Sequence, residues 1–293
     1  MPWQQLTLNV KEDDAALIEE FLNERGAVSV TLMDAEDQPV FQVDLDTTPI
    51  WNNTQVQGLF EHDAPIEIII ASMRENLPCT KELPINIEEV EDAEWERVCM
   101  QDFVPMQFGE KIWICPSWET PPQPNATNIL LDPGLAFGTG THPTTALCLE
   151  WLDQQEIAGK TVIDYGCGSG VLAIAAALLG AKEVIAIDND PQAITATISN
   201  RELNGISEDQ LRVYLPGEQG HPLADIVVAN ILAGPLEALT PIIAALCKPG
   251  GKLILSGVLS QQTQSLMKSY QEYFTMLEPA LREEWVRVEG IRR

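Results

Sequence analysis

The second half of the sequence alternates short apolar segments typical of strands with segments typical of helices, and this alternation restricts the fold more than any other feature. Five segments have the composition of buried strands, namely 160–166, 182–190, 211–215, 224–231 and 251–258. Four segments have the spacing of helices, namely 171–181, 191–205, 235–247 and 260–274. Apolar strands that alternate with helices form parallel sheets covered on both faces. The sequence therefore predicts an α/β, doubly wound, mostly parallel sheet, followed by extended stretches at 274–280 and 283–291.

The first ninety residues follow a different order, with a strand, a helix, strands, a second helix and a last strand. Extended patterns occupy 3–10, 28–34, 38–44, 54–60 and 85–90, and helical spacing occupies 13–27 and 65–76. This order predicts a small α+β (ferredoxin-like) domain over residues 1–92, with both helices on one face of an antiparallel sheet. We expect residues 93–125, which include a proline-rich turn, to connect it to a second domain at 126–293.

The charge of the chain restricts its partners. There are 17 Lys and Arg against 44 Asp and Glu, a net charge of −27, and residues 1–130 alone hold 6 basic and 25 acidic side chains. Such a field repels the phosphates of nucleic acids and attracts basic proteins. We therefore expect no direct nucleic-acid partner, although solubility alone is an alternative explanation of the charge.

Other features of the composition exclude further classes. No uncharged apolar run reaches the roughly 18 residues of a membrane-spanning helix, and the N-terminus lacks a basic segment followed by an apolar core. We expect a cytoplasmic protein without a membrane partner. The six cysteines are scattered and form no CxxC pair, so we expect neither a metal site nor a disulfide framework.

The first strand of the predicted parallel sheet ends in a glycine-rich loop, Asp164-Tyr165-Gly166-Cys167-Gly168-Ser169-Gly170. A dinucleotide fingerprint needs a small residue at 171, where this chain has Val171, so a nicotinamide oxidoreductase is disfavoured. No lysine follows in the position of a P-loop. Asp164 enters the loop as an acid, which suits an ammonium group better than a pyrophosphate.

Asp188 closes the next predicted strand, 22 positions after Gly166. A carboxylate at this place accepts the hydroxyls of a ribose. An adenosine and an ammonium without a phosphate describe S-adenosylmethionine. VIDYGCGSG and VIAIDNDPQAI also resemble motifs one and two of the class I methyltransferases, which implies a Rossmann-like methyltransferase sheet.

A third motif, DIVVANILAGPL, lies at the end of the fourth predicted strand. Many amine and amide methyltransferases carry N-P-P-[YF] here, where the Asn side chain and a carbonyl hold the acceptor nitrogen. Asn230 retains the Asn, but Ile231, Leu232 and Ala233 replace the rest. This difference argues against a DNA adenine or a glutamine methyltransferase.

The motifs together resemble one family over essentially the whole chain. LDPGLAFGTGTHPTT at 131–145, VIDYGCGSG, VVANILAGPL and WERVCMQDFVPMQFGEKIWICPSW are similar to the PrmA family, which methylates the eleventh protein of the large ribosomal subunit. The resemblance implies an N-terminal substrate-recognition domain. It also implies transfer of methyl groups from S-adenosylmethionine to lysine ε-amines and the α-amine, with S-adenosylhomocysteine as product. We expect a monomer.

The resemblance also assigns site residues. The cofactor contacts that it implies are Thr145, Gly166, Asp188 and Asn230, joined by Asp164, Gly168, Phe137, Gly138 and Thr139. The loop at 134–142 is expected to close over the reacting methyl group.

Two residues are candidates for catalysis. Asn230 and nearby carbonyls would orient the acceptor nitrogen, and His142 is either a general base or a brace for the turn before a helix. A lysine of pKa about 10.4 loses its proton near pH 7 at a cost of roughly 4.6 kcal/mol, which a desolvated slot reduces. A dedicated base is therefore not required. Alternative functions are a non-catalytic S-adenosylmethionine-binding module and a methyltransferase of another protein or a small amine.

Overall fold

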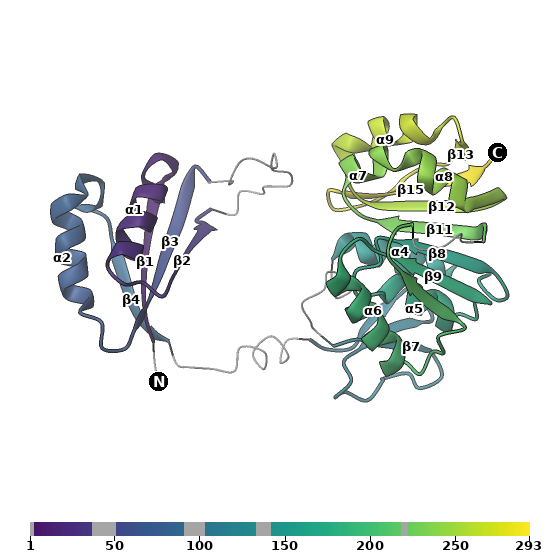
Figure 1. Cartoon of the computed structure of the whole chain (residues 1–293), viewed down its shortest axis with the longest axis horizontal. Coiled ribbons are helices and arrows are strands. Elements are labelled where there is room, and N and C mark those ends of the chain that lie inside the picture. Colours follow the sequence, from purple (N-terminus) through teal and green to yellow (C-terminus); the bar gives the residue numbers. More distant parts are fainter. Residues whose placement is uncertain (1–2, 37–50, 91–102, 133–141, 218–221) are drawn as a thin grey trace. The chain divides into compact units, whose positions relative to one another are not determined.

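The computed structural model describes residues 3–36, 51–90, 103–132, 142–217 and 222–293. Contacts divide the chain into two compact units, Met1–Trp95 and Glu96–Arg293. Figure 1 draws both units. The strand expected at 38–44 lies outside the described residues. No helix within these ranges is long and apolar enough to cross a membrane.

The first unit contains one antiparallel sheet with the strand order β2-β3-β1-β4. Its elements are β1 (Trp3–Lys11), α1 (Glu12–Glu24), β2 (Ser29–Asp34), β3 (Asn53–Glu61), α2 (Ile66–Asn76), the 3-10 turn η1 (Pro78–Thr80) and β4 (Ile85–Val90). Alternate residues of β1, Leu6, Leu8 and Val10, are buried in a core that also contains Ile18 of α1 and Met73 of α2. The period of two places both helices on one sheet face. The predicted α+β (ferredoxin-like) architecture is confirmed.

The second unit is built on an eight-stranded sheet with the order β10-β9-β8-β11-β12-β15-β13, and β14 pairs with β15. The neighbouring strands β10, β9, β8, β11 and β12 are parallel to one another. Strands β13, β14 and β15 are antiparallel to their neighbours. The sheet strands are β8 (Thr161–Tyr165), β9 (Glu183–Ile187), β10 (Leu211–Tyr214), β11 (Ala224–Asn230), β12 (Cys247–Leu259), β13 (Phe274–Met276), β14 (Ala280–Arg282) and β15 (Trp285–Arg292). The doubly wound, mostly parallel methyltransferase sheet that the sequence predicts is confirmed.

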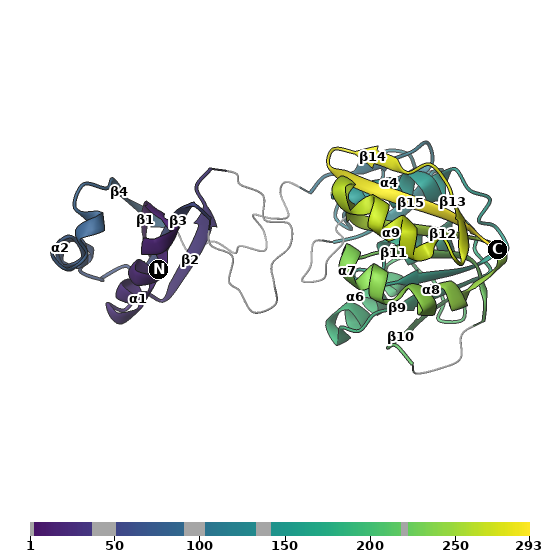
Figure 2. The same cartoon turned by 90° about the horizontal axis from the view of Figure 1, so that it is seen from above.

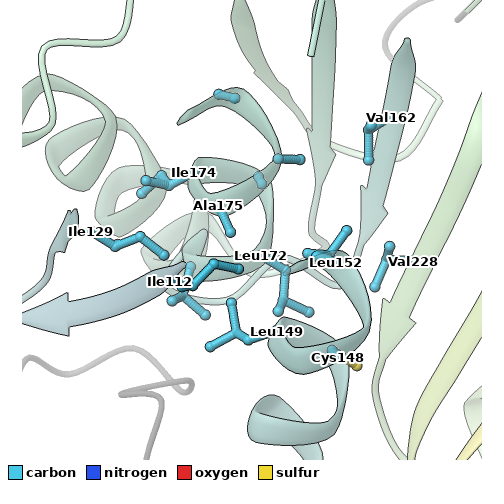
Figure 3. Close-up of a cluster of buried hydrophobic side chains, with 14 of the residues drawn as sticks. Ile112, Ile129, Cys148, Leu149, Leu152, Val162, Leu172, Ile174, Ala175 and Val228 are labelled. Carbon is cyan, nitrogen blue, oxygen red and sulfur yellow. The ribbon is translucent and has the colours of Figure 1, made fainter. Parts of the chain in front are cut away.

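Helices cover both faces of this sheet. They are α4 (Pro143–Asp153), α5 (Val171–Leu178), α6 (Pro191–Leu203), α7 (Ala233–Ala238), α8 (Thr240–Leu246) and α9 (Thr263–Tyr270), with a 3-10 turn η2 at Ser260–Gln262. Neighbouring residues of β8 belong to opposite cores, Val162 to the α4 and α5 side and Ile163 to the α7, α8 and α9 side. Figure 3 shows the first of these cores, where Leu149 and Leu172 lie beside Ile112. A strand buried on both faces explains why the sequence reads as continuous apolar runs.

A smaller sheet of three strands packs on the α4 and α5 side. Its strands are β5 (Met106–Phe108), β6 (Ile112–Cys115) and β7 (Thr127–Leu130), in that order. Ile112, Ile114 and Ile129 are fully buried in the same core as the two helices. Residues 103–125, which we expected in a connector, are therefore in the second unit.

Two predicted elements differ in their bounds. The helix expected at 235–247 is interrupted at Leu239, so that α8 begins at Thr240 with Pro241 in its first turn. A proline lacks the N–H that would continue the preceding helix, which explains the break. Strand β12 begins at Cys247, four residues before the expected start at 251, because Cys247 already pairs with Ala224 of β11.

Candidate functional site

The predicted site residues gather at one edge of the large sheet. Asp164 is the second-last residue of β8, Asp188 directly follows β9, and Asn230 is the last residue of β11. These strands are parallel neighbours, so their carboxyl ends meet at the same edge. Ligands of open α/β sheets bind beyond this edge. The order of the strands places the three side chains in the sequence Asp188, Asp164, Asn230 across the edge.

The glycine-rich loop joins β8 to α5 and is hydrogen-bonded to the end of β9. Gly166, Gly168 and Gly170 have φ values of 80°, 55° and 80°, which L side chains rarely adopt. The Gly166 amide donates to the Ile187 carbonyl at 2.7 Å, and the Gly168 amide donates to Asp188 Oδ2 at 2.9 Å. A Cβ atom at Gly166 would collide with the Ile231 side chain. The loop therefore runs close to both flanking strands and needs glycine at this point.

Helix α6 holds the same loop through two polar side chains. The Thr197 hydroxyl donates to the Gly168 carbonyl at 3.0 Å, and Asn200 Nδ2 donates to the Ser169 carbonyl at 2.8 Å. A Cβ atom at Gly170 would lie 2.7 Å from Thr197 Cγ2. Sequence reasoning missed both residues. The available signal was a polar pair three positions apart in 191–205, on a helix face that meets the loop.

Asp164 is 1% exposed and is only partly satisfied. Its Oδ2 accepts the Ala173 amide in the first turn of α5 at 3.0 Å, while Oδ1 has no hydrogen-bond partner among the described residues. The pKa of this carboxyl is raised to about 7, mainly by burial; the Ala173 amide works against the rise, and the nearby Asp188 adds to it. A buried carboxylate oxygen without a partner fits a cationic group of a ligand at this edge.

Asp188 is half-buried, and both of its carboxylate oxygens are fixed by backbone donors. Oδ2 accepts the Gly168 amide at 2.9 Å, and Oδ1 accepts the Asp190 amide at 3.0 Å. Each oxygen of an ionised carboxylate can accept two hydrogen bonds. Asp188 is thus oriented at the edge of the sheet with capacity for two further donors, as a vicinal diol of a ribose would supply.

Asn230 and Thr145 come together although 85 residues separate them. Asn230 Nδ2 donates to Thr145 Oγ1 at 3.3 Å, which joins the end of β11 to the first turn of α4. Thr145 is 2% exposed, and Asn230 is half-buried. Among the described residues the amide oxygen of Asn230 accepts no hydrogen bond, so the pair can orient a donor group that enters beside it.

His142 is the N-cap residue of α4. Its Nδ1 accepts the Thr144 amide at 3.3 Å and lies 2.8 Å from Thr144 Oγ1. The imidazole also meets the Trp285 ring edge-on, with 4.8 Å between the ring centroids and 70° between the planes. These contacts support the bracing role that the sequence left open. Because Nδ1 accepts the Thr144 amide, the neutral imidazole carries its proton on Nε2, which leaves no free ring nitrogen to act as a general base.

Three predicted cofactor contacts, Phe137, Gly138 and Thr139, lie outside the described residues. The structure therefore places Thr145 and His142 at the exit of that loop and says nothing of the loop itself. Within the described ranges, no group of three or more His, Cys, Asp or Glu side chains is close enough to hold a metal ion.

Comparisons with known proteins agree over the whole chain. The family model "Ribosomal protein L11 methyltransferase (PrmA)" matches residues 2–293. The ribosomal protein L11 methyltransferase of Marinobacter nauticus is 51% identical over 296 residues, which cover 100% of this chain and 99% of that relative. That of Azotobacter vinelandii is 51% identical over 294 residues and covers 100% of both chains.

A solved structure is similar as well. The ribosomal protein L11 methylase of Lactobacillus delbrueckii subsp. bulgaricus superposes with a TM-score of 0.60 at 33% identity. The superposition covers 65% of this chain and 100% of that one. The likeness in sequence thus extends from one end of the chain to the other, and the likeness in structure extends over most of it.

Proposed function

The chain belongs to the ribosomal protein L11 methyltransferase (PrmA) family, and from this membership we propose that it methylates lysine ε-amines and the N-terminal α-amine of ribosomal protein L11. It is an S-adenosylmethionine-dependent methyltransferase. The observation that best supports the proposal within the structure is the pair of carboxylates that flank the glycine-rich loop, because they suit an ammonium and a ribose and leave no place for a phosphate.

We propose specific roles for the residues at the sheet edge. Asp188 accepts the ribose hydroxyls, and the backbone of Gly166 and Gly168 lies against the nucleoside. The partnerless oxygen of Asp164 balances the charge of the methionine ammonium, directly or through a water molecule. Thr145 and Asn230 lie at the methionine end, near the exit of the loop that contains Phe137, Gly138 and Thr139. These residues fit S-adenosylmethionine in charge, and their order along the sheet edge matches the order of the ribose, the ammonium and the methyl group.

The chemistry needs few side chains. Bound S-adenosylmethionine would supply an electrophilic methyl group on its sulfonium, and the sulfur would keep the electron pair of the broken bond. Asn230 orients the nitrogen through its amide oxygen, and positioning of this kind contributes about 7 to 11 kcal/mol in well-oriented systems. The acceptor must arrive neutral, so a slot that excludes water lowers the cost of removing its proton. His142 is then a brace rather than a base.

The first unit is proposed to recognise the protein substrate. Residues 1–95 hold 21 acidic and 4 basic side chains, a net charge of −17, and a basic ribosomal protein would be attracted to them. We propose a monomeric enzyme of the cytoplasm that acts on free protein without contacting nucleic acid directly.

Labelled S-adenosylmethionine, offered with the full set of ribosomal proteins, tests the proposal. We expect label on L11 alone, and mass spectrometry of digested L11 should place it on lysines and the N-terminus. Asp188→Ala should abolish labelling by removing the ribose acceptor, whereas Asp209→Ala, at an exposed position of the same unit, should leave it intact. Label on another protein would redirect the substrate assignment. Tight cofactor binding without any labelled protein would instead indicate a non-catalytic module.

A further inference from the structure

Strand β12 contains a β-bulge at the point where β11 ends. Between Leu255 and Val258, two residues of β12, Ser256 and Gly257, lie opposite a single residue of β15. On its other side, Ser256 is in register with Asn230, the last residue of β11. Figure 2 shows β12 between these two strands. The bulge therefore lies directly beside the end of the strand that carries Asn230.

The bulge needs glycine at its second position. Gly257 has a φ of 84°, in the left-handed region that favours glycine. The backbone of Ile231 lies against it, because a Cβ atom at Gly257 would be 2.8 Å from the Ile231 carbonyl carbon and 3.1 Å from its nitrogen. A glycine in a strand often marks such a bulge or a close approach of another backbone. Gly257 thus makes room for the residue that follows Asn230.

Ile231 meets a second glycine through its side chain. A Cβ atom at Gly166 would collide with the Cγ2 methyl group of Ile231, while the Ile231 Cβ atom would be 3.7 Å away. The sheet order is β8-β11-β12, so Ile231 lies between the loop that follows β8 and the bulge of β12. One residue thus contacts the cofactor loop with a methyl group and the bulge with its backbone.

Little else fixes the segment that follows Asn230. Only Ile231 and Leu232 join β11 to α7, and Leu232 is 51% exposed. Leu232 is the N-cap residue of α7 but supplies no side-chain hydrogen bond to the helix. The first proline after Asn230 is Pro235, inside α7. The packing of Ile231 between the two glycines therefore sets where this segment lies.

The bulge also holds the helix that contacts Asn230. Ser256 is fully buried, and its hydroxyl donates to the Thr144 carbonyl at 3.3 Å. The next residue of α4, Thr145, accepts the hydrogen bond from Asn230 Nδ2. Ser256 thus acts on the Asn230–Thr145 pair from the α4 side, and Gly257 acts on it from the β11 side through Ile231.

We propose that Gly257 is a positioning residue for methyl transfer, because its bulge holds Ile231 against Gly166 and so fixes Asn230 relative to the cofactor loop. The inference rests on the proposed function, in which Asn230 orients the acceptor nitrogen. Transfer needs the nitrogen in line with the methyl group at roughly 3 to 3.5 Å, and a displacement of about 1 Å can lower the rate about 100-fold. Ile231 is the contact that joins the loop that binds the donor to the residue that orients the acceptor.

A pair of glycine variants on one strand tests the role of Gly257. Gly257→Ala adds a methyl group that collides with Ile231, whereas Gly250→Ala adds one where nothing lies within 4 Å. Gly250 is also in β12 and has a φ of 77°, so both variants carry a similar backbone strain. We expect Gly257→Ala to lower kcat for L11 by about 100-fold with a much smaller change in KM and in the Kd of S-adenosylhomocysteine. Gly250→Ala should change none of the three.

Equal losses of kcat in the two glycine variants would overturn the proposal, because backbone strain alone would then explain them. An unchanged kcat in Gly257→Ala would overturn it as well.

Two substitutions of Ile231 test the contact with Gly166. Ile231→Val keeps the Cγ2 methyl group, and Ile231→Leu keeps the size of the side chain but has no methyl group on Cβ. We therefore expect Ile231→Leu to lose more of kcat than Ile231→Val does. The opposite order would contradict a role for the Cγ2 contact.

NMR of the full chain gives a measurement that does not depend on methyl transfer. With ¹³C in the Cγ2 methyl groups of isoleucine, the resonance missing from Ile231→Val is that of Ile231. We expect it to shift when S-adenosylhomocysteine is added, and to be displaced in Gly257→Ala but not in Gly250→Ala. An undisplaced resonance in Gly257→Ala would overturn the proposal. Failure of the unaltered chain to methylate L11 would contradict the proposed function instead, and the Ile231 resonance would still decide whether Gly257 controls the cofactor edge.

Discussion

Asp164 combines three properties at the scale of a single residue: it is buried, its Oδ2 accepts the Ala173 amide, and its Oδ1 has no partner within the described part of the chain. Its pKa is raised to about 7, so between about pH 4 and pH 7 the folded chain holds a proton that the unfolded chain has released. Ionisation of Asp164 therefore lowers the free energy of unfolding as pH rises through this window, with no further change above it. A cationic ligand group beside the carboxylate would reverse this effect.

Cofactor affinity should consequently depend on pH through Asp164. If the ionised carboxylate balances the ammonium, affinity for S-adenosylmethionine should rise by up to about tenfold per pH unit between pH 5 and 7 and then level off. Titration calorimetry in buffers of different ionisation enthalpy should detect proton release in the same window. Asp164→Asn should bind more weakly above pH 7 and show a flat profile below it. A variant with the steep profile of the unaltered chain would remove Asp164 from the cofactor site.

At the scale of elements, α6 acts as a support for the glycine-rich loop. Thr197 is fully buried, and its hydroxyl lies 3.3 Å from Cys167 Sγ as well as donating to the Gly168 carbonyl. The loop backbone is thus fixed from the helix side before any ligand binds. Preorganisation of this kind favours affinity because less ordering remains to be done on binding.

Thr197→Val keeps the shape of the side chain and removes the hydroxyl. We expect the free energy of unfolding to fall by about 1 to 3 kcal/mol, since a buried carbonyl loses its partner. S-adenosylmethionine affinity should fall as well, because the loop is less constrained. The matched control is Thr195→Val on the same helix, whose exposed hydroxyl donates to the Pro191 carbonyl at 2.9 Å. Chemical denaturation and calorimetry report the two effects, and equal behaviour of both variants would refute the supporting role.

Elements differ in how far the sequence alone predicts them. The parallel strands and their glycine-rich loop are predictable because the constraint is local: apolar runs form strands, and only glycine adopts the backbone of Gly166 and Gly170. Asp164 and Asp188 follow from their positions at strand ends. The contacts of Thr197 and Trp285 depend on packing between segments that are distant in sequence, which local patterns do not contain. Pro241 indicates a break before α8, but the helical spacing of apolar residues continues on both sides of it and favours one long helix.

For the whole molecule, the distribution of charge predicts how the protein substrate arrives. The net charge is −27, and most of it lies in residues 1–130. Attraction between unlike charges raises association rates, and salt screens it over about 8 to 10 Å at physiological concentrations. The two compact units have separate cores.

The association rate of the chain with L11 should therefore fall by about tenfold or more between low and high salt. Stopped-flow or surface-binding measurements at several salt concentrations provide this rate, and dissociation should change less. Neutralising Glu20 and Glu24 on α1 should reduce the salt dependence, whereas neutralising Glu208 and Asp209 in the second unit should not. Salt-independent association would leave solubility as the explanation of the charge.

The polar contacts proposed for the cofactor have a consequence for inhibition. In the proposed arrangement Asp164 faces the ammonium, Asp188 the ribose, and Gly166 and Gly168 the nucleoside, all of which the demethylated product retains unchanged. Only the positive charge on sulfur and the methyl group distinguish the two molecules. None of these four residues is proposed to contact the sulfur or the methyl group. Spent cofactor should thus compete with fresh cofactor at similar affinity. The rate of methylation in a cell should then depend on the ratio of S-adenosylmethionine to S-adenosylhomocysteine, and not on the concentration of S-adenosylmethionine alone.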